Sequence, residues 1–479
     1  MRGKNLRSLI TLMSFFFLLW FFPVKGEAKE VPLIRVALEK GAATASFQVV
    51  SGGYTFTDES SGLPIAEVHP GQVWKVTASG TALLLEGPGI SGTKVFSGPL
   101  HLQEKDGNKL NLFSHKGICY RGDLVIQNLD GHLLVVNLID IEKYLYGVVG
   151  REMGAGAAPE AYRAQAVVSR SYALSMRGLN PWYDVGVDTG TQVYGGYTGE
   201  TAYEVSGRNP VIEAVEATRG KVLEYEGKLV QAFFHSNAGG HTEDVENVWL
   251  EPRPYLRGVP SPADSYAEVE GGWAAATYRW VKTMTREELE ERLGVGRIKE
   301  IRVSRWRTRV TRDPVTGKLR REFVPGTRTV SGRATAVTVV GDEGEKSYYR
   351  DSIRTPFNLK STLFDLVFEG QLQVLTLNGE VKPLTEPQVY VLGKGGLVSS
   401  PSDEEKYCVL GKNNQKSLRG ISFERVIFIG RGCGHGVGLS QWGARGLAVE
   451  GYTWRQIVEH YYNQDRYDGK LQVVDDYGL

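Results

Sequence analysis

Residues 159–174 read PEAYRAQAVVSRSYAL, and this stretch carries the clearest secondary-structure signal in the chain. Pro159 stands where a helix can begin, because the first helical turn does not need the N–H that proline lacks. Tyr162, Ala166 and Ala173 then recur at helical spacing. The stretch therefore predicts a helix with a stripe of small buried residues.

Other helices are predicted on both sides of this stretch. Residues 141–149 favour a short helix with Asp140 as its N-cap, and the Gly- and Ala-rich segment 154–158 favours a bend after it. Thr285 and Glu288 have capping-box spacing, which predicts a helix near 285–293. Two closing helices are predicted, over 440–449 and after the capping pair Thr453 and Gln456.

The rest of the chain favours strands and turns, as its 58 glycines also indicate. Residues 31–140 contain apolar runs such as LIRVAL (33–38) without a sustained helical period. We expect a hairpin over 222–234, a charged exposed hairpin or insertion over 307–330, and a small β insertion over 370–425. The predicted fold is α+β, mostly β with a few helices around a substrate cleft. Its predicted core comprises 141–369 and 426–465, preceded by the β-rich part 31–140.

The N-terminal segment has the order of a secretory signal. Arg2, Lys4 and Arg7 precede the apolar run 9–24, and small residues follow, so residues 1–28 are predicted to be a signal peptide or an uncleaved membrane anchor. Either interpretation places the body of the protein outside the cytoplasm.

Charge and cysteine content exclude some classes of protein. The net charge is +1, and removing the four basic residues of 1–26 leaves −3, which does not favour nucleic acid as a partner. Cys119, Cys408 and Cys433 are few and widely spaced, so they predict neither a disulfide framework nor a zinc knuckle.

Glu152 is the first candidate for chemistry, in the bend predicted between the two helices. A carboxylate there can point into a cleft, and partial desolvation would raise its pKa so that it can donate a proton to a glycosidic oxygen. The alternative is a surface or helix-capping acid. Arg170 could orient Glu152 or a substrate carboxylate, although the spacing alone favours a solvated arginine on an ordinary helix.

Two glycine-rich segments contain histidines. His235 and His241 flank the turn in HSNAGGHTE (235–243), and with Glu246 they could bind zinc, although substrate binding or loop packing explains the pattern as well. The segment GCGHGVGLSQWGA (432–444) predicts close backbone approach around His435. A nucleophilic Cys433 with His435 as its base is conceivable, but the spacing alone gives this dyad little weight.

These segments, in this order, resemble the stage II sporulation protein D family, also called the SpoIID/LytB domain family. The resemblance covers roughly residues 33–465. It is carried by seven stretches: YLYGVVGREM (144–153), PEAYRAQAVVSRSYAL (159–174), DTGTQVYGG (188–196), 214–249, PYLRGV (254–259), SGRATAVTVVG (331–341) and GCGHGVGLSQWGARGLAVEGYTWRQIVEHYY (432–462).

The resemblance implies a peptidoglycan lytic transglycosylase acting on peptide-free glycan strands, with Glu152 as its catalytic residue. Some members hold zinc, for which His235, His241 and Glu246 would be the ligands here. Gly154 departs from the proline that is usual after the "EM" pair. The expected substrate-binding residues are Arg170, Ser171, Gln192, Tyr194, His235, Ser236, Gly239, Gly240, Thr242, Glu243, His435 and Gln441.

The resemblance also implies a role in sporulation, in wall thinning during engulfment. The expected partners are glycan strands, a peptidoglycan amidase and membrane proteins of an engulfment complex. Two other functions stay open: a non-catalytic amidase enhancer or wall-binding scaffold, and a zinc amidase built on His235 and His241. The sequence carries no established amidase signature.

Overall fold

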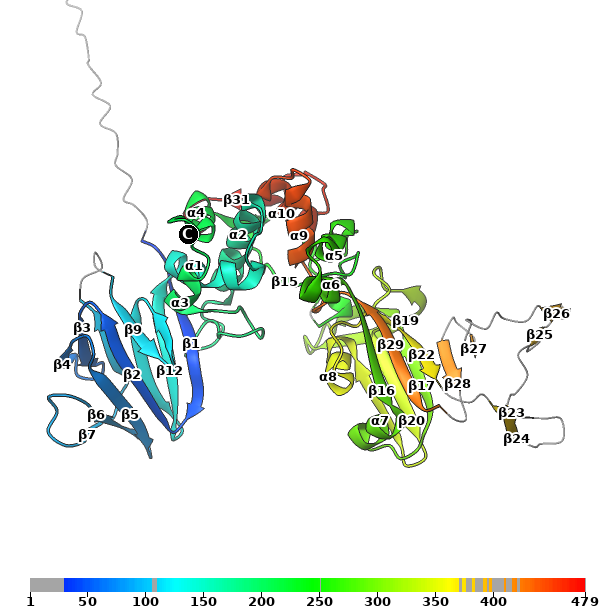
Figure 1. The fold of residues 1–479 in the computed structure, drawn as a ribbon, viewed down its shortest axis with the longest axis horizontal. Coiled ribbons are helices and arrows are strands. Elements are labelled where there is room, and N and C mark those ends of the chain that lie inside the picture. The colour runs from blue at the N-terminus through cyan, green and yellow to red at the C-terminus, as the bar shows by residue number, and fades with distance from the viewer. Residues whose placement is uncertain are drawn as a thin grey trace, which may run out of the picture. The chain divides into compact units, whose positions relative to one another are not determined.

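The structure, a computed structural model, describes residues 30–105, 110–249, 251–369 and 423–478, together with the backbone of short strands between 373 and 419. The fold is α+β with more strand than helix, as the sequence predicts (Figure 1). No helix in this described part of the chain is long and apolar enough to cross a membrane. The predicted signal or anchor over 1–28 lies outside the described residues, as does Cys408.

The N-terminal part is built from two antiparallel sheets of six strands each. The strands are β1 (Leu33–Ala42), β2 (Thr44–Ser51), β3 (Tyr54–Asp58), β4 (Leu63–Val68), β5 (Val73–Ser79), β6 (Ala82–Glu86), β7 (Lys94–Phe96), β8 (Leu100–Glu104), β9 (Leu112–His115), β10 (Ile118–Tyr120), β11 (Asp123–Leu129) and β12 (His132–Asp140). One sheet has the order β1-β12-β11-β8-β3-β4 and the other β10-β9-β2-β5-β6-β7. The ring of Phe56 in β3 lies 5.7 Å from Phe47 in β2 and 5.6 Å from Trp74 in β5. The two sheets therefore pack face to face around buried aromatic rings.

The helical part follows the sheets directly. Its helices are α1 (Ile141–Met153), α2 (Pro159–Met176), α3 (Gly196–Thr201), α4 (Pro210–Ala217), α9 (Gln441–Val449) and α10 (Trp454–Asn463). Asp140 caps α1 through the Lys143 N–H, and Thr453 and Gln456 form the predicted capping box of α10. Helix α1 extends beyond the predicted end at 149, because it stops only at Gly154, whose φ of 75° ends the helix. Glu152 thus lies in the last turn of α1 and not in the bend.

Two small sheets connect this helical part with distant segments. Their strands are β13 (Val222–Tyr225), β14 (Lys228–Leu229), β31 (Leu471–Val474), β15 (Phe234–His235) and β30 (Leu439–Ser440). The predicted hairpin over 222–234 forms only as far as Leu229. Phe234 and His235 instead pair in parallel with Leu439 and Ser440. This correction matters because β15 carries His235 to the start of α9.

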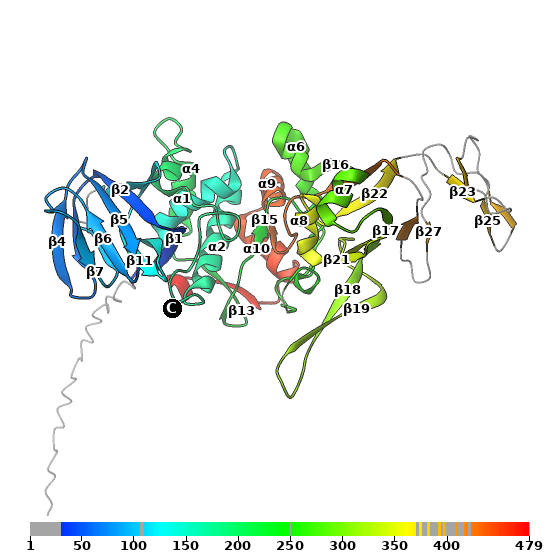
Figure 2. The ribbon, with the colours of Figure 1, turned by 90° about the horizontal axis from the view of Figure 1, so that it is seen from below.

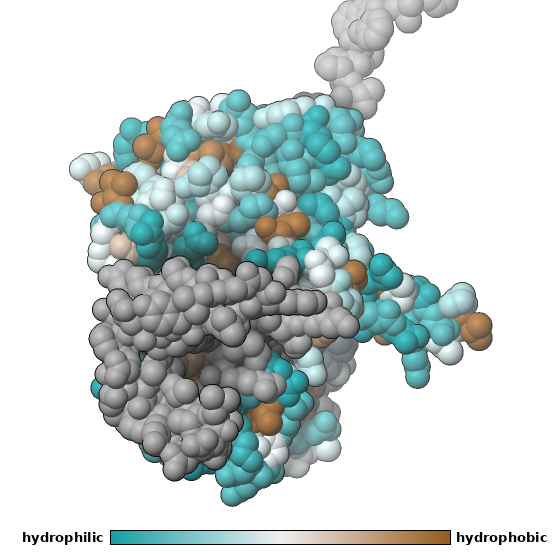
Figure 3. Space-filling view, turned by 90° about the vertical axis from the view of Figure 1, so that its right-hand side faces the viewer, coloured by the Kyte–Doolittle hydropathy of each residue, from teal (hydrophilic) through white to brown (hydrophobic). Residues whose placement is uncertain are grey.

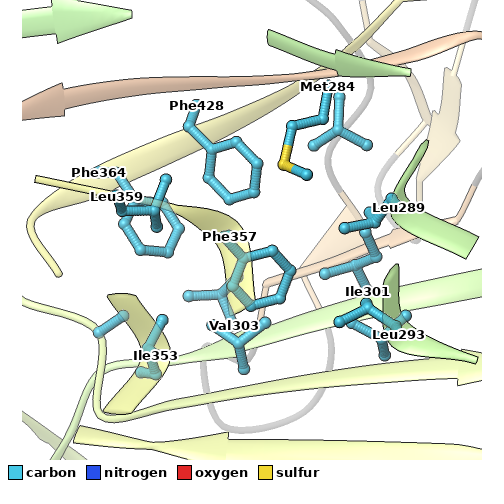
Figure 4. Close-up of a cluster of buried hydrophobic side chains, with 14 of the residues drawn as sticks. Met284, Leu289, Leu293, Ile301, Val303, Ile353, Phe357, Leu359, Phe364 and Phe428 are labelled. Atoms are coloured by element: carbon cyan, nitrogen blue, oxygen red, sulfur yellow. The ribbon is translucent and has the colours of Figure 1, made fainter. Parts of the chain in front are cut away.

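A second region of helices and sheets follows β15. Its elements are α5 (Tyr266–Glu270), α6 (Gly272–Tyr278), β16 (Arg279–Thr285), α7 (Arg286–Leu293), β17 (Ile298–Ser304), β20 (Ala336–Gly341), β21 (Glu345–Tyr349), α8 (Arg354–Phe357), β22 (Phe364–Glu369) and β29 (Arg425–Arg431). Thr285 caps α7 through the Glu288 N–H, as predicted. Side chains from α7, α8 and the strands fill one buried cluster, shown in Figure 4, around Phe357, Phe428 and Leu289.

The charged segment predicted over 307–330 is an exposed hairpin. Its strands β18 (Trp306–Arg312) and β19 (Leu319–Arg328) form a two-stranded sheet that extends away from the neighbouring strands in Figure 2. The face drawn in Figure 3 is mainly hydrophilic where it is coloured, and apolar residues occur there in small groups.

Residues 370–425, the segment of the predicted insertion, contain short strands. They are β23 (Gln373–Leu375), β24 (Val381–Pro383), β25 (Val391–Gly393), β26 (Gly396–Val398), β27 (Val409–Leu410) and β28 (Lys416–Arg419). β28 pairs with β17, so the five-stranded sheet β21-β20-β17-β28-β27 includes the end of this segment.

Candidate active site

Glu152 is held by two segments that lie far from it in the sequence. Its Oε1 accepts a hydrogen bond of 2.6 Å from the backbone N–H of Val193, and its Oε2 accepts one of 3.0 Å from Nε2 of Gln441. Gln441 is the first residue of α9, so the Gly-rich segment before α9 aims its side chain at the end of α1. The two hydrogen bonds fix both oxygens of the carboxyl group.

The surroundings of Glu152 favour its protonated form. Burial raises the pKa of this carboxyl above its usual value, and the hydrogen bonds from Val193 and Gln441 offset only part of that effect. Both donors are neutral, and among the described residues no basic side chain forms an ion pair with Glu152. A half-buried carboxyl without a cation can hold a proton at a pH where a solvated glutamate has lost it.

Two tyrosines lie near this carboxyl. Burial raises the pKa of Tyr172 to about 12, and the negative charge of Glu152 adds to the shift. Tyr172 packs edge-on against Phe233 and Phe234, with ring centroids 5.7 and 6.3 Å apart. Burial and nearby acidic groups, Glu152 among them, also raise the pKa of Tyr144. Both phenols are therefore neutral neighbours of Glu152.

Gln192 and Tyr194 position the backbone that binds Glu152. The buried Gln192 amide accepts a hydrogen bond from the Tyr144 hydroxyl at 3.1 Å and donates one to the Ser169 carbonyl at 3.4 Å. The Tyr194 hydroxyl donates to Asn137 Oδ1 at 3.0 Å. The sequence led us to expect that both side chains bind substrate, but both are hydrogen-bonded within the protein instead. They hold Val193, which lies between them, against the end of α1.

His235 and His435 form a second polar group, next to the start of α9. Their ring centroids are 5.2 Å apart, and the Trp249 ring stands perpendicular to His435 at 4.7 Å. Nδ1 of His235 lies 3.2 Å from the Val437 carbonyl and must therefore carry a proton, which leaves Nε2 as an acceptor. In the described part of the chain this buried Nε2 has no partner.

Both imidazoles are neutral. Burial lowers the pKa of His235 well below its usual value and that of His435 to about 4. Nδ1 of His435 accepts the Val437 N–H at 3.1 Å, so Nε2 of this ring carries the proton. The pair thus offers one unused acceptor, His235 Nε2, whereas His435 also has a backbone hydrogen bond with Phe234.

Glycines allow the two histidine segments to approach. Gly434 has a φ of +101°, and a Cβ at this position would lie 2.9 Å from the His235 Cβ. Gly239 has a φ of +74°, and its Cβ would lie 2.8 Å from the Gly432 backbone. The predicted close approach around 432–438 is therefore observed, and it occurs between the two histidine segments themselves.

Arg170 and Ser171 do not belong to this site, which corrects the sequence-based prediction. The fully buried Arg170 guanidinium donates to both oxygens of Glu142, at 2.6 and 2.9 Å. The Ser171 hydroxyl donates to the Val167 carbonyl and accepts the Leu223 N–H. Both residues stabilise the packing of α2.

Most of the segment 236–243 is also structural. Glu243 is buried, accepts hydrogen bonds from Asn247 at 2.8 Å and from Ser331 at 2.5 Å, and so does not face a ligand. Thr242 Oγ1 accepts the Val259 N–H at 2.7 Å. Ser236 is only half-buried, and Gly240 donates its N–H to Asp264. Of the substrate-binding residues predicted in this segment, His235 and Ser236 therefore remain the candidates for contact with a ligand.

The predicted zinc ligands do not form a set. Glu246 forms an ion pair with Arg257, and His241 Nδ1 lies 2.6 Å from the Thr242 carbonyl. The described residues contain no group of three histidine, cysteine or carboxylate side chains that could hold a metal ion. His235, His241 and Glu246 therefore do not converge as a ligand set in the described structure. Zinc binding stays a prediction, and no step below depends on it.

The sequence analysis did not identify Asp264, which connects the His235 segment with the start of the helix that carries Gln441. Asp264 accepts the Ser440 hydroxyl at 2.5 Å and the Gly240 N–H at 2.9 Å, and it thereby ties the His235 segment to the start of α9. Burial raises its pKa to about 6. Burial also raises the pKa of the Cys433 thiol, which disfavours a nucleophilic thiolate. No local pattern marks Asp264, because its partners lie 24 and 176 residues away.

Comparison with known proteins agrees with this arrangement. Residues 129–225, which contain α1, α2 and Val193, match the family model described as Stage II sporulation protein. The chain is 26% identical over 338 residues to Stage II sporulation protein D of Bacillus subtilis, which covers 68% of this chain and 74% of that protein. It is 28% identical over 327 residues to an Amidase enhancer of the same organism, covering 66% of this chain and 39% of that protein. An uncharacterized protein of Brachyspira hyodysenteriae is 25% identical over 377 residues, covering 78% of this chain and 77% of that protein.

The class of protein defined by fold and site is thus an α+β protein with a desolvated glutamate at the end of a helix. The family match over residues 129–225 and these relatives support the resemblance seen in the sequence: the chain carries a Stage II sporulation protein domain and is similar to Stage II sporulation protein D.

Proposed function

We propose that this protein is an exported lytic transglycosylase that cleaves peptide-free peptidoglycan strands with Glu152. The observation that supports the proposal most is the environment of the Glu152 carboxyl. Burial raises its pKa, and the two groups that donate hydrogen bonds to it are both neutral. One carboxyl group suffices for this reaction, because acid and base act one after the other.

The first step is protonation of the bond to be cleaved. Protonated Glu152 donates its proton to the oxygen between N-acetylmuramic acid and N-acetylglucosamine, and the C1–O bond of the muramoyl residue breaks. The donors Val193 N–H and Gln441 Nε2 stabilise the carboxylate that results. In the second step this carboxylate removes the proton of the muramoyl C6 hydroxyl, and O6 bonds to C1. The product is a 1,6-anhydro end, and Glu152 regains its proton.

His235 and His435 fit the binding of uncharged sugar groups. Neutral imidazoles offer hydrogen bonds without attracting a counter-ion, and Nε2 of His235 is an unused acceptor in the described structure. Trp249 and Phe233 pack around His435 and supply apolar surface beside it. We assign these residues to holding the strand, with Glu152 performing the chemistry.

Product analysis tests this function. Wild-type protein incubated with amidase-treated glycan strands should release fragments that end in 1,6-anhydro-N-acetylmuramic acid, identified by mass spectrometry. Glu152→Gln should release none, whereas the exposed control Glu213→Gln should act like wild type. Reducing ends without the anhydro ring, or full activity of Glu152→Gln, would contradict the proposal.

A second candidate function is non-catalytic enhancement of an amidase, because one relative carries the name Amidase enhancer. It predicts glycan binding without cleavage, together with faster release of stem peptides by a separately added amidase. The zinc amidase considered from the sequence loses its basis, since His241 and Glu246 are engaged elsewhere.

The relatives and the N-terminal segment support a proposal for the cellular role, the partners and the location of the protein. We assign the protein to wall remodelling in sporulation, with glycan strands, an amidase and membrane proteins of an engulfment complex as partners. It would act in the wall or at the outer face of the cytoplasmic membrane, where residues 9–24 could anchor it. Fractionation of cells that express the full chain tests this location.

A further inference from the structure

We propose that the hairpin Trp306–Arg328, formed by β18 and β19, is a second binding surface for the same glycan strand and that it recognises the strand's repeated carboxylates. This inference rests on the proposed substrate, but not on cleavage. It assigns a role to a segment with a strong excess of positive charge.

The basic hairpin, residues 306–328, has an unusual charge for this protein. It contains seven basic residues, Arg307, Arg309, Arg312, Lys318, Arg320, Arg321 and Arg328, and two acids, Asp313 and Glu322. Its net charge is therefore +5, whereas the whole chain carries only +1. Such segregation creates a local positive potential that attracts anionic ligands.

One group of these cations fastens the hairpin to the body of the protein. Arg307 pairs with Asp244 at 3.2 Å, Arg312 pairs with Glu251, and Arg321 donates to the Trp249 carbonyl at 3.2 Å. These interactions explain why a two-stranded sheet, which is marginal by itself, has a defined place.

Of the other four cations, Arg320 pairs with Glu322 within the hairpin at 2.8 Å. Within the described residues Arg309, Lys318 and Arg328 are exposed and form no ion pair with an acid. Neutralising them would therefore leave the interactions that fasten the hairpin intact.

The base of the hairpin adjoins the candidate active site. The Thr308 N–H donates to Asn247 Oδ1 at 2.7 Å, and the Trp249 carbonyl that binds Arg321 belongs to the residue whose ring packs on His435. From this base the strands extend outward (Figure 2). A rise of about 3.3 Å per residue spreads the free cations over roughly 20 Å. A polymer that passes the histidines can therefore follow the hairpin.

The chemistry of a peptide-free strand fits this surface. Each muramic acid carries a lactyl ether that ends in a free carboxylate once the stem peptide is gone, so the strand is an anion of regular spacing. Guanidinium groups bind carboxylates in bidentate geometry. A phosphate polymer or an anionic membrane would also be attracted by charge, but neither contains the sugar bond that must reach Glu152.

Binding measured without cleavage tests the inference. All proteins carry Glu152→Gln, and the probe is long peptide-free glycan strands freed of phosphate polymer by hydrofluoric acid. Arg309→Gln, Lys318→Gln and Arg328→Gln together should weaken binding about tenfold at low salt, with the difference shrinking at high salt. The matched control removes the same charge elsewhere, through Arg208→Gln, Lys228→Gln and Arg455→Gln, and should bind like the parent.

Three outcomes would overturn the inference: equal binding by both triple variants, an unchanged tenfold loss on strands whose lactyl carboxylates have been converted to amides, or binding restricted to phosphate polymer or anionic vesicles. A second readout uses active Glu152. The hairpin variant should cleave a tetrasaccharide, too short to reach the free cations, at the parental rate while it cleaves long strands more slowly. If no protein cleaves but the hairpin variant loses binding, the inference stands and the proposed catalysis fails.

Discussion

Helix α1 contains two buried or half-buried glutamates, ten residues apart, whose surroundings differ in one respect. Glu142 is fully buried and bound by the Arg170 guanidinium and by the Gly220 N–H. Glu152 is bound only by the neutral donors Val193 and Gln441. The cation makes the first carboxylate a structural ion pair. Its absence leaves the second able to take up and release a proton.

The largest expected effect separates the two glutamates by function. Glu152→Gln should lower the rate of strand cleavage by roughly 10³-fold, the scale of general acid–base catalysis, while the thermal midpoint does not fall below that of wild type. Glu142→Gln should instead lower the midpoint strongly. The two variants are compared by their activity per folded molecule and by thermal unfolding. A stable but inactive Glu142→Gln protein, or an unstable but active Glu152→Gln protein, would contradict the comparison.

Breaking the ion pair from its other side sharpens the comparison. Arg170→Met leaves Glu142 buried without a cation and should lower the free energy of unfolding by about 3–5 kcal/mol. Urea unfolding measures this, with the exposed Arg208→Met as a control expected within about 0.5 kcal/mol of wild type. An Arg170→Met protein that is as stable as the control but inactive would contradict this account and indicate that Arg170 acts in the active site.

Features that depend on residues close together in the sequence could be predicted, whereas contacts between residues far apart in the sequence could not. The helices around Asp140, Pro159 and Thr453 follow from local capping rules, so the sequence predicts them well. The partners of Arg170 and Glu152 do not: Glu142 lies 28 residues from Arg170, and Gln441 lies 289 residues from Glu152. Spacing alone favoured a solvated Arg170 over one that binds Glu152 or substrate.

The same reason explains the errors in the candidate site. His235, His241 and Glu246 are close in sequence and chemically suited to zinc, but Arg257 takes the carboxylate and the fold turns the second imidazole to its own backbone. Glu152 itself was identified through the family resemblance, whereas its desolvation and its neutral donors became visible only in the structure.

A smaller effect is expected from the donor side of Glu152. Gln441→Ala removes one of two hydrogen bonds that oppose the rise of the Glu152 pKa, so that pKa should rise further. The falling limb of the pH–rate profile should then move to higher pH, and the maximal rate should fall by about tenfold through loss of carboxylate stabilisation. A lower rate with an unmoved limb would mean that Gln441 only supports packing.

The smallest effect concerns the thiol beside His435. Because burial raises the pKa of Cys433, this thiol is a poor nucleophile, and Cys433→Ser should keep the cleavage rate within about twofold of wild type. Complete loss of activity in a folded Cys433→Ser protein would favour a cysteine-based reaction over one based on Glu152.

The most direct test of the central claim is the pH dependence of the stability difference between Glu152→Gln and wild type. The folded protein raises the pKa of Glu152, so wild type takes up this proton on folding and loses that contribution as pH rises through the raised pKa. The glutamine variant has no such proton. Measured by chemical unfolding from about pH 4 to pH 8, its stability relative to wild type should increase with pH and then level off. A relative stability that is flat, or that decreases with pH, would show that Glu152 is an ordinary ionised carboxylate in the folded protein.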